Sequence, residues 1–275
     1  MQLAIAPGTR GVQQLTVSNS GQTTTGQVQV IYVTPSYTNI DRVAALPDGC
    51  TMRYENPDPG VPEVVSCLLP AGIEQGESVH LAMPLDAPLE ARLTGTNRGM
   101  LTAYPVDGSP DVENTLNDNW AGTYLQFTAP TPALPAGNKV NLYLAGSLPV
   151  LAADGTATAV FTYGNAGRNA TTGTVEISAV TPFTLNIDRD KQLPDGCEIV
   201  LADESIAVSE QILCTLPALA AGEERQIAIP LKAPAQSPAG LLYAPALVSP
   251  GTGDVDTNQI DNLGALMALA PDRSA

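Results

Sequence analysis

Leu46-Pro47-Asp48-Gly49-Cys50 recurs as Leu193-Pro194-Asp195-Gly196-Cys197, 147 residues later in a chain of 275 residues. Cys67 recurs as Cys214 at the same offset, so each half contains two cysteines 17 positions apart. Pro-Asp-Gly is a turn signal, because proline presets its own φ and glycine tolerates a positive φ. The sequence therefore predicts a duplication in which each copy carries one turn and one pair of cysteines.

Further landmarks occur in the same order in both halves, with insertions of only a few residues between them. The matched segments are Asn19-Ser20-Gly21 with Asn165-Ala166-Gly167, Val33-Thr34-Pro35 with Val180-Thr181-Pro182, Leu69-Pro70 with Leu216-Pro217, Gly76-Glu77 with Gly222-Glu223, and Met83-Pro84-Leu85 with Ile229-Pro230-Leu231. Late in each half, an acidic stretch, Asp111-Val112-Glu113 or Asp254-Val255-Asp256, precedes an Asp-Asn pair, Asp118-Asn119 or Asp261-Asn262. This ordered series is typical of a tandem repeat.

Both halves alternate apolar and polar residues over short runs bounded by turn signals, the pattern of half-buried strands. The predicted strands cover 12–18, 27–33, 79–83, 99–106 and 123–127, and then 158–163, 174–180, 227–229, 240–248 and 265–269. No window has convincing helical periodicity, and 24 Gly and 24 Pro interrupt the chain frequently. We therefore predict an all-β fold of two tandem immunoglobulin-like β-sandwiches, each with one internal disulfide.

The predicted domains are residues 1–128 and 138–275. A proline-rich linker, residues 129–137, joins them, and its prolines favour extended backbone. No apolar run approaches the length needed to cross a bilayer. The first residues lack a basic segment followed by an apolar one, so no export signal is expected there.

The four cysteines favour disulfides, Cys50–Cys67 and Cys197–Cys214, each joining two neighbouring strands. Such a loop stabilises the folded state by about 3 kcal/mol in the chain-entropy model. The alternative, a four-cysteine zinc site, lacks the short Cys-x-x-Cys pairs that zinc sites use. Because disulfides persist in oxidising compartments, the sequence predicts an extracellular or cell-surface location.

A net charge of −16, from 12 basic and 28 acidic residues, argues against nucleic-acid partners and anionic membranes. Catalysis is also disfavoured. The one histidine, His80, lies on a predicted strand with its side chain toward solvent, and its counterpart is Gln226. Established catalytic motifs are missing, although a paired-carboxylate glycosidase stays open, because carboxylate separation is invisible in a sequence.

Two other chemistries concern the loops and the lysines. Asp111, Glu113 and Asp118 in the first copy, and Asp254, Asp256 and Asp261 in the second, form a weak candidate calcium site; the alternative is that they make Asx turns. A Lys–Asn isopeptide bond is disfavoured, because Lys139, Lys191 and Lys232 have no lysine counterparts in the other copy. Asn169-Ala170-Thr171 matches a glycosylation sequon.

The Pro-Asp-Gly-Cys turn, the second cysteine before Leu-Pro, the Gly-Glu pair and the late acidic loop together resemble bacterial surface repeats. These are the CARDB-type and related conserved surface-repeat domains, and the resemblance covers both halves nearly end to end. It implies an immunoglobulin-like fold and a non-catalytic structural or adhesive role in a stalk or surface assembly. The implied partners are other surface proteins, further copies of the chain or surface glycans.

The alternative is a glycan- or protein-binding module appended to a secreted enzyme. Sugars stack on exposed aromatic rings, but aromatic residues make up only 4% of the chain. Trp120, Tyr54 and Tyr104 are the main candidates for such a surface.

Overall fold

The computed structural model describes residues 2–55, 62–88, 96–106, 111, 119–128, 136–182, 184–201, 210–234 and 240–271. All regular structure in these residues is β-strand, as predicted, and the described part of the chain contains no helix that could cross a bilayer. The chain divides into two compact units, Met1–Thr131 and Pro132–Ala275. That division falls inside the predicted linker, of which residues 129–135 lie outside the described residues.

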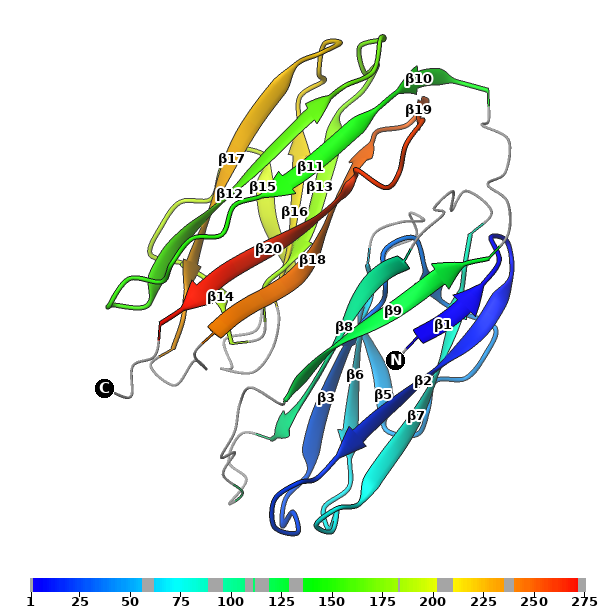
Figure 1. The fold of residues 1–275 in the computed structure, drawn as a ribbon, viewed down its shortest axis with the longest axis vertical. Coiled ribbons are helices and arrows are strands. Elements are labelled where there is room, and N and C mark those ends of the chain that lie inside the picture. Colours follow the sequence, from blue (N-terminus) through cyan, green and yellow to red (C-terminus); the bar gives the residue numbers. More distant parts are fainter. Residues whose placement is uncertain are drawn as a thin grey trace. The chain divides into compact units, whose positions relative to one another are not determined.

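The first unit consists of a six-stranded sheet and a three-stranded sheet (Figure 1). The larger sheet has the order β1-β9-β8-β3-β6-β5, and the smaller has the order β2-β7-β4. Their bounds are β1 Gln2–Ile5, β2 Arg10–Ser18, β3 Val28–Val33, β4 Asn39–Ile40, β5 Cys50–Tyr54, β6 Val64–Leu69, β7 Ser78–Asp86, β8 Thr96–Pro105 and β9 Trp120–Phe127.

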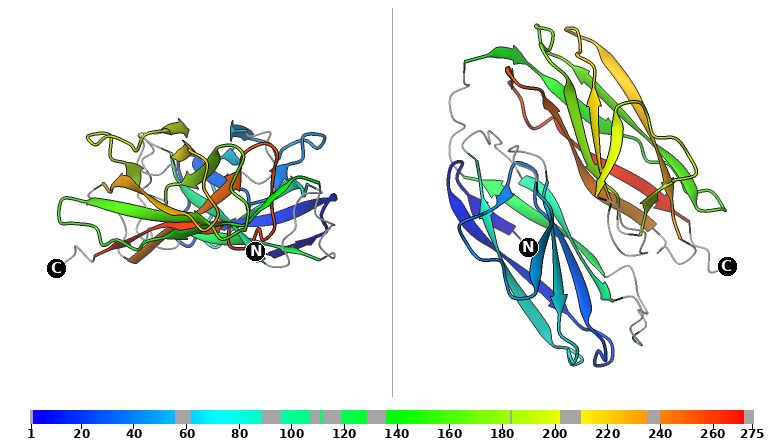
Figure 2. Two further views of the ribbon diagram at one scale, coloured as in Figure 1. Left: turned by 90° about the horizontal axis from the view of Figure 1, so that it is seen from above. Right: turned by 180° about the vertical axis from the view of Figure 1, so that it is seen from behind.

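The second unit has a five-stranded sheet in the order β15-β16-β13-β18-β20 and a four-stranded sheet in the order β11-β12-β17-β14; β10 and β19 form a separate parallel pair. The bounds are β10 Asn138–Val140, β11 Leu142–Gly146, β12 Thr156–Asn165, β13 Val175–Val180, β14 Asn186–Ile187, β15 Cys197–Leu201, β16 Gln211–Leu216, β17 Glu224–Lys232, β18 Gly240–Pro250, β19 Asp254–Asp256 and β20 Leu263–Ala270. Figure 2 shows the strands of each unit in two further views.

The core of the second unit draws its side chains from both of its sheets. In the second unit, Leu142 and Phe161 of the four-stranded sheet join Ile177 and Ile212 of the five-stranded sheet in one buried cluster. Burying a side chain of this size contributes about 1.5–3 kcal/mol. The mainly aliphatic composition of this cluster is what the low aromatic content of the sequence requires.

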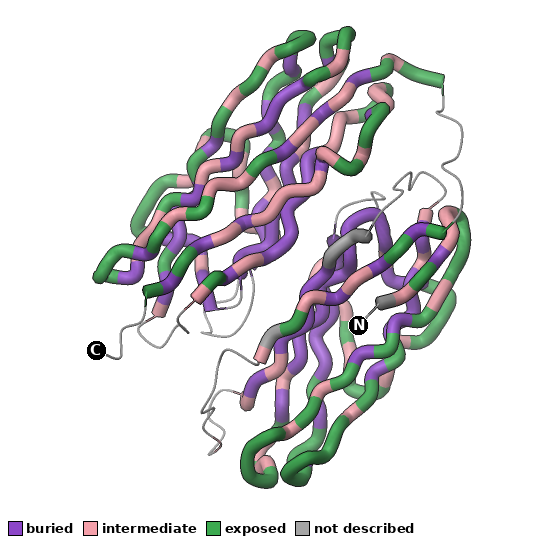
Figure 3. Tube along the Cα trace, viewed as in Figure 1, coloured by how far each residue is buried: buried purple, intermediate pink, exposed green. Residues whose placement is uncertain are grey.

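Burial differs between the larger and the smaller sheet of the first unit (Figure 3). The central strand β3 is buried almost continuously, whereas β2 alternates between exposed and buried positions. All ten predicted strands are confirmed, since each overlaps an observed strand. The strands β4, β11 and β14 were not predicted. The parallel pairs β1–β9 and β10–β19 were also missed, because partners distant in the sequence leave no local pattern.

Candidate functional site

Both predicted disulfides are present, and each joins two adjacent antiparallel strands. Cys50 pairs with Cys67 across β5 and β6, and Cys197 pairs with Cys214 across β15 and β16. In each bridge the Cα atoms are 3.9 Å apart. The described residues contain no free cysteine. Because the structure pairs the cysteines in this way, it gives no support to a four-cysteine zinc site.

The Pro-Asp-Gly-Cys motif forms the turn that brings each bridge into register. In the first unit, the N–H of Cys50 donates to the carbonyl of Pro47 at 3.0 Å, which closes the turn. Gly49 has a φ of 77°, and an added Cβ would lie 2.6 Å from the carbonyl oxygen of Leu68. Glycine is therefore required at this position for two reasons: the positive φ of the backbone and the close approach of β6.

The second unit repeats this geometry 147 residues later. The N–H of Cys197 donates to the carbonyl of Pro194 at 3.0 Å. Gly196 has a φ of 81°, and its added Cβ would lie 2.4 Å from the carbonyl oxygen of Thr215. The recurrent sequence motif thus corresponds to a recurrent structural motif.

Each unit also contains a fully buried glutamate that is paired with an arginine. The Glu63 side chain is 0% exposed and accepts hydrogen bonds from the N–H of Ile40 at 2.6 Å and the guanidinium of Arg42 at 2.5 Å. Its own N–H donates to Thr34 Oγ1 at 2.9 Å. These contacts attach the short strand β4 to the beginning of β6, and so connect the two sheets.

The second unit builds the same arrangement around Glu210. This side chain is also 0% exposed, and it accepts from the N–H of Ile187 at 2.6 Å and from Arg189 at 2.5 Å. The N–H of Glu210 donates to Thr181 Oγ1 at 2.8 Å. Neither glutamate was predicted as a site residue, although Asn39-Ile40-Asp41-Arg42 recurs as Asn186-Ile187-Asp188-Arg189, a signal that could have revealed both pairs.

The first aspartate of each acidic loop ties that loop to the turn before β3 or β13. Asp111 accepts hydrogen bonds from the N–H of Thr25 at 2.9 Å, the hydroxyl of Thr25 at 2.6 Å and the N–H of Gly26 at 2.7 Å. Asp254 accepts from the N–H and hydroxyl of Thr172 at 2.8 and 2.9 Å, and from Asn138 at 2.7 Å.

These hydrogen bonds set the ionisation of Asp254. Partial burial acts to raise the pKa of its carboxyl, but the bonds from Asn138 and Thr172 together outweigh that effect. The pKa of Asp254 therefore lies below its ordinary value, and the carboxylate is charged at neutral pH.

The other two candidate calcium ligands of the second unit, Asp256 and Asp261, are more buried than Asp254. Asp256 is 5% exposed and accepts from the N–H groups of Leu142 and Asn258, each at 2.8 Å. Burial raises the pKa of Asp256 to about 6, despite these bonds. Burial also raises the pKa of Asp261, which accepts from the side chain of Asn258 at 2.8 Å.

The described residues include no group of three or more acidic, histidine or cysteine side chains placed to hold a metal ion. In the second unit, both oxygens of Asp254 and both oxygens of Asp256 already accept hydrogen bonds. Their roles here are those of turn and loop acceptors, the alternative that the sequence left open. Glu113 and Asp118, which complete the candidate set in the first unit, lie outside the described residues.

His80 is exposed on β7, as predicted, and its Nδ1 lies 3.1 Å from the hydroxyl of Thr16 on β2. The counterpart pair in the second unit is Gln226 and Thr162, joined by a hydrogen bond of 3.1 Å. Histidine and glutamine thus make the same cross-strand contact on the outer face of the sheet, which is a structural contact that either side chain can make.

The remaining candidates are dispersed. Lys139, Lys191 and Lys232 are all exposed, so none has the buried amine that an isopeptide bond would need. Asn169 is exposed, and its amide donates to the carbonyl of Lys139 at 3.1 Å. Among the aromatic candidates, Tyr104 is buried, Tyr54 is half-buried, and the side chain of Trp120 lies outside the described residues.

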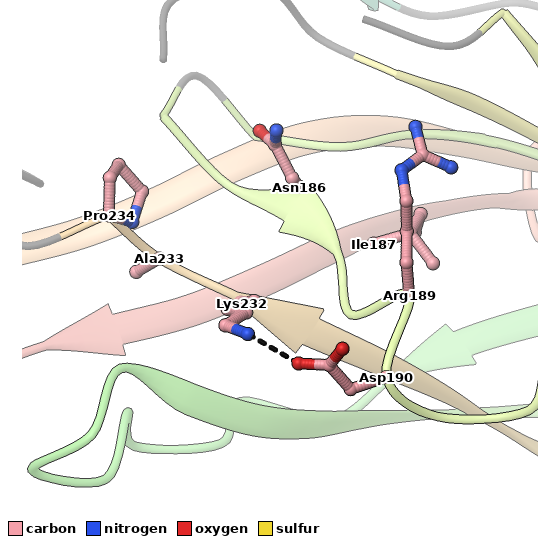
Figure 4. Close-up of a pocket in the computed structure, with 7 residues that line it drawn as sticks. All are labelled: Asn186, Ile187, Arg189, Asp190, Lys232, Ala233 and Pro234. Atoms are coloured by element: carbon pink, nitrogen blue, oxygen red, sulfur yellow. Dashed lines mark hydrogen bonds and ion pairs between the residues drawn. The ribbon is translucent and has the colours of Figure 1, made fainter. Parts of the chain in front are cut away.

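A pocket of about 300 Å³ lies beside β14 and the end of β17 (Figure 4). Its charged residues are already paired, since Lys232 Nζ lies 2.6 Å from Asp190 and Arg189 binds Glu210. A second pocket of about 520 Å³ is lined in part by Asn141 and Asn258. Neither pocket is lined by a described histidine or cysteine that could act as a base or nucleophile.

Comparisons with known proteins identify no family for this chain. No family model matches it, and no curated protein matches it. One similar solved structure is the transglutaminase of red sea bream, with 11% sequence identity and a TM-score of 0.29. That match covers 98% of this chain, but the chain spans only 30% of the transglutaminase. At so low a TM-score, the match supports no conclusion about fold or activity.

Proposed function

We propose that this chain is a non-catalytic, extracellular structural module made of two immunoglobulin-like β-sandwiches that arose by duplication. The module would serve as a stalk, or as part of an assembly, of a bacterial cell-surface or secreted protein. The observation that carries the proposal is the repetition of structural supports. The disulfide, the glycine turn and the buried Glu–Arg pair occur in each unit at the same 147-residue offset. By contrast, the one histidine of the chain is replaced by glutamine in the second unit.

The proposed location follows from the disulfides, which indicate an oxidising environment. Each bridge also closes a loop between neighbouring strands, and this loop cannot lengthen when the chain is pulled. A stalk experiences this kind of load. The repeated bridges are therefore consistent with a module that must stay short under tension.

Single-molecule force spectroscopy on the whole chain tests the mechanical role. Each disulfide shields 17 residues from extension, which corresponds to about 60 Å at roughly 3.5 Å per residue. We expect two unfolding events per molecule, each lengthening by about 60 Å after reduction. Equal extension lengths before and after reduction would contradict the shielding.

Surface labelling tests the location. A membrane-impermeant biotin reagent applied to intact producing cells, or to their culture medium, should label the chain. Labelling that requires cell lysis would place the chain inside the cell and overturn the proposal.

A further inference from the structure

The first and last segments of the second unit run side by side in the same direction. Residues 138–151 follow the linker, and residues 254–270 contain the last two strands of the unit. β10 pairs in parallel with β19, and Val150 forms a parallel bridge with Leu269 near the other end. Figure 1 shows β11 beside β20, with both arrows pointing the same way. The two segments are therefore parallel from β10 to the end of β20.

Backbone hydrogen bonds join these two segments near their beginning, in the middle and near their end. The donor–acceptor distances are 2.8 or 2.9 Å, and the N–H to carbonyl bonds run from Thr257 to Val140, from Leu144 to Asp261, from Leu269 to Pro149 and from Leu151 to Leu269. Between the last two levels, Gly146 passes so close to β20 that an added Cβ would lie 2.1 Å from the carbonyl oxygen of Ala265. The two backbones are therefore in direct contact there.

Two acidic residues of the late loop add side-chain bonds to the same contact. Asp254 accepts from the side chain of Asn138 at 2.7 Å, and Asp256 accepts from the N–H of Leu142 at 2.8 Å. Both carboxyl groups belong to the last segment, and both donors belong to the first. Hydrogen bonds to an ionised acceptor are roughly twice as strong as bonds between neutral groups. These aspartates therefore strengthen the attachment of the first segment to the last.

The parallel arrangement decides how a stretching force acts on this contact. A pull along the chain draws the beginning of the first segment and the end of the last segment apart. Because the segments are parallel, this pull slides one along the other, so all the bonds between them bear the force at the same time. A pair of strands pulled apart from neighbouring ends would instead open one bond at a time and resist less.

We propose that residues 138–151 and 254–270 form a mechanical clamp, a contact that must shear before the second unit can unfold under tension, and that Asp254 and Asp256 strengthen it. This inference rests on the proposed function, since a clamp matters only where a stretching force passes through the chain. The first unit contains part of the same arrangement, because β1 lies parallel to β9.

The buried Glu210 provides a matched control, because it stabilises the same unit from outside the clamp. Glu210 accepts from the N–H of Ile187 and from the guanidinium of Arg189, and so attaches β14 to the beginning of β16. Neither strand belongs to the two clamp segments. Loss of Glu210 should therefore lower the stability of the unit at equilibrium and leave the contact that shears first intact.

Constant-force unfolding of the whole chain tests the clamp, because forced unfolding reports the unfolding rate. In a Cys50→Ser/Cys67→Ser background, unfolding of the first unit lengthens by about 60 Å, which separates it from unfolding of the second unit. We expect Asp256→Ala to raise the unfolding rate of the second unit about tenfold or more, the effect of losing one or two hydrogen bonds. Glu210→Ala should raise that rate by less than about threefold, since its contacts persist when the clamp breaks.

A second clamp variant covers the case in which Asp256→Ala does not fold. Asn138→Ala removes one clamp bond at a half-buried position, and it should raise the unfolding rate by about threefold or more. Thermal melting first establishes which variants are folded.

Two results would overturn the proposal. The first is an unchanged unfolding rate in every folded clamp variant. The second is an equal rise in Glu210→Ala, because the rate would then follow only the overall stability of the unit. Either result leaves the reduction and labelling tests of the proposed function unaffected. Conversely, labelling that places the chain inside the cell would overturn the proposed function without changing the measured clamp, so the two proposals fail separately.

Discussion

Substituting Glu210 by alanine removes the buried acceptor that ties β14 to the beginning of β16. The side chain is 0% exposed, and it accepts from the N–H of Ile187 and from the guanidinium of Arg189. The substitution leaves a buried N–H without its acceptor and a guanidinium without its carboxylate. Both effects destabilise the second unit, and both follow from contacts within that unit.

The expected loss is about 3–5 kcal/mol in the free energy of unfolding, the usual cost of removing one partner of a buried ion pair. Roughly 1–3 kcal/mol of this comes from the unpaired N–H of Ile187. The Arg189 side chain is 39% exposed, so water screens its part of the interaction and favours the lower end of the range. We therefore expect about 3 kcal/mol.

Calorimetry and urea denaturation of the whole chain measure this loss. Glu63→Ala is the matched variant, because Glu63 makes the same contacts with Ile40 and Arg42 at the same distances. Each variant should lower the transition of its own unit by a similar amount. A loss below about 1 kcal/mol in both would refute the reasoning that these glutamates hold the sheets together.

Three further predictions concern the acidic loops. Asp254→Ala should lower the unfolding free energy of the second unit by about 2–3 kcal/mol in urea denaturation, because charge-assisted hydrogen bonds from Thr172 and Asn138 are lost. A Thr172→Ala variant that lowers it by as much would argue against the carboxylate as the centre of the contact. Burial raises the pKa of Asp256 to about 6, so the folded state binds the proton of this carboxyl more tightly than the unfolded chain does. The contribution of Asp256 to the unfolding free energy should therefore fall by about 3 kcal/mol as the pH rises from roughly 4 to 6. The difference in unfolding free energy between wild type and Asp256→Asn, measured across that range, should show this slope, and a constant difference would count against it. Calorimetric titration with calcium should give no heat, and a chelator should not change the melting temperature. The reason is that both oxygens of Asp254 and of Asp256 already accept hydrogen bonds from N–H donors. A calcium-dependent rise in melting temperature would show that the acidic loops bind calcium after all.

The sequence predicted features that leave a local or repeated pattern. β2 was predicted because the apolar residues Leu15 and Val17 alternate with polar neighbours. In the structure Leu15 is buried, whereas Gln14 and Thr16 face solvent. The cysteine pairs were predicted because the same spacing occurs twice, and the Pro-Asp-Gly turn explains why each pair comes into register.

Other features depend on partners that a local pattern cannot reveal. Hydropathy places Glu63 at the surface, and only the fold shows that Arg42 and the N–H of Ile40 make its burial tolerable. The parallel pairing of β1 with β9 joins residues more than a hundred positions apart, so it too was missed. Of the acidic candidates, Asp111 and Asp254 proved to be corresponding loop acceptors, a role that depends on the positions of Thr25 and Thr172.

The most direct test of the whole account is the state of the four sulfurs in native protein, recovered from its producing cells under acid quench with a thiol-blocking reagent. Peptide mapping by mass spectrometry without reduction should find Cys50 linked to Cys67, Cys197 linked to Cys214, and no blocked thiols. Four blocked thiols, or links that cross between the units, would contradict a module in which each half closes its own covalent loop.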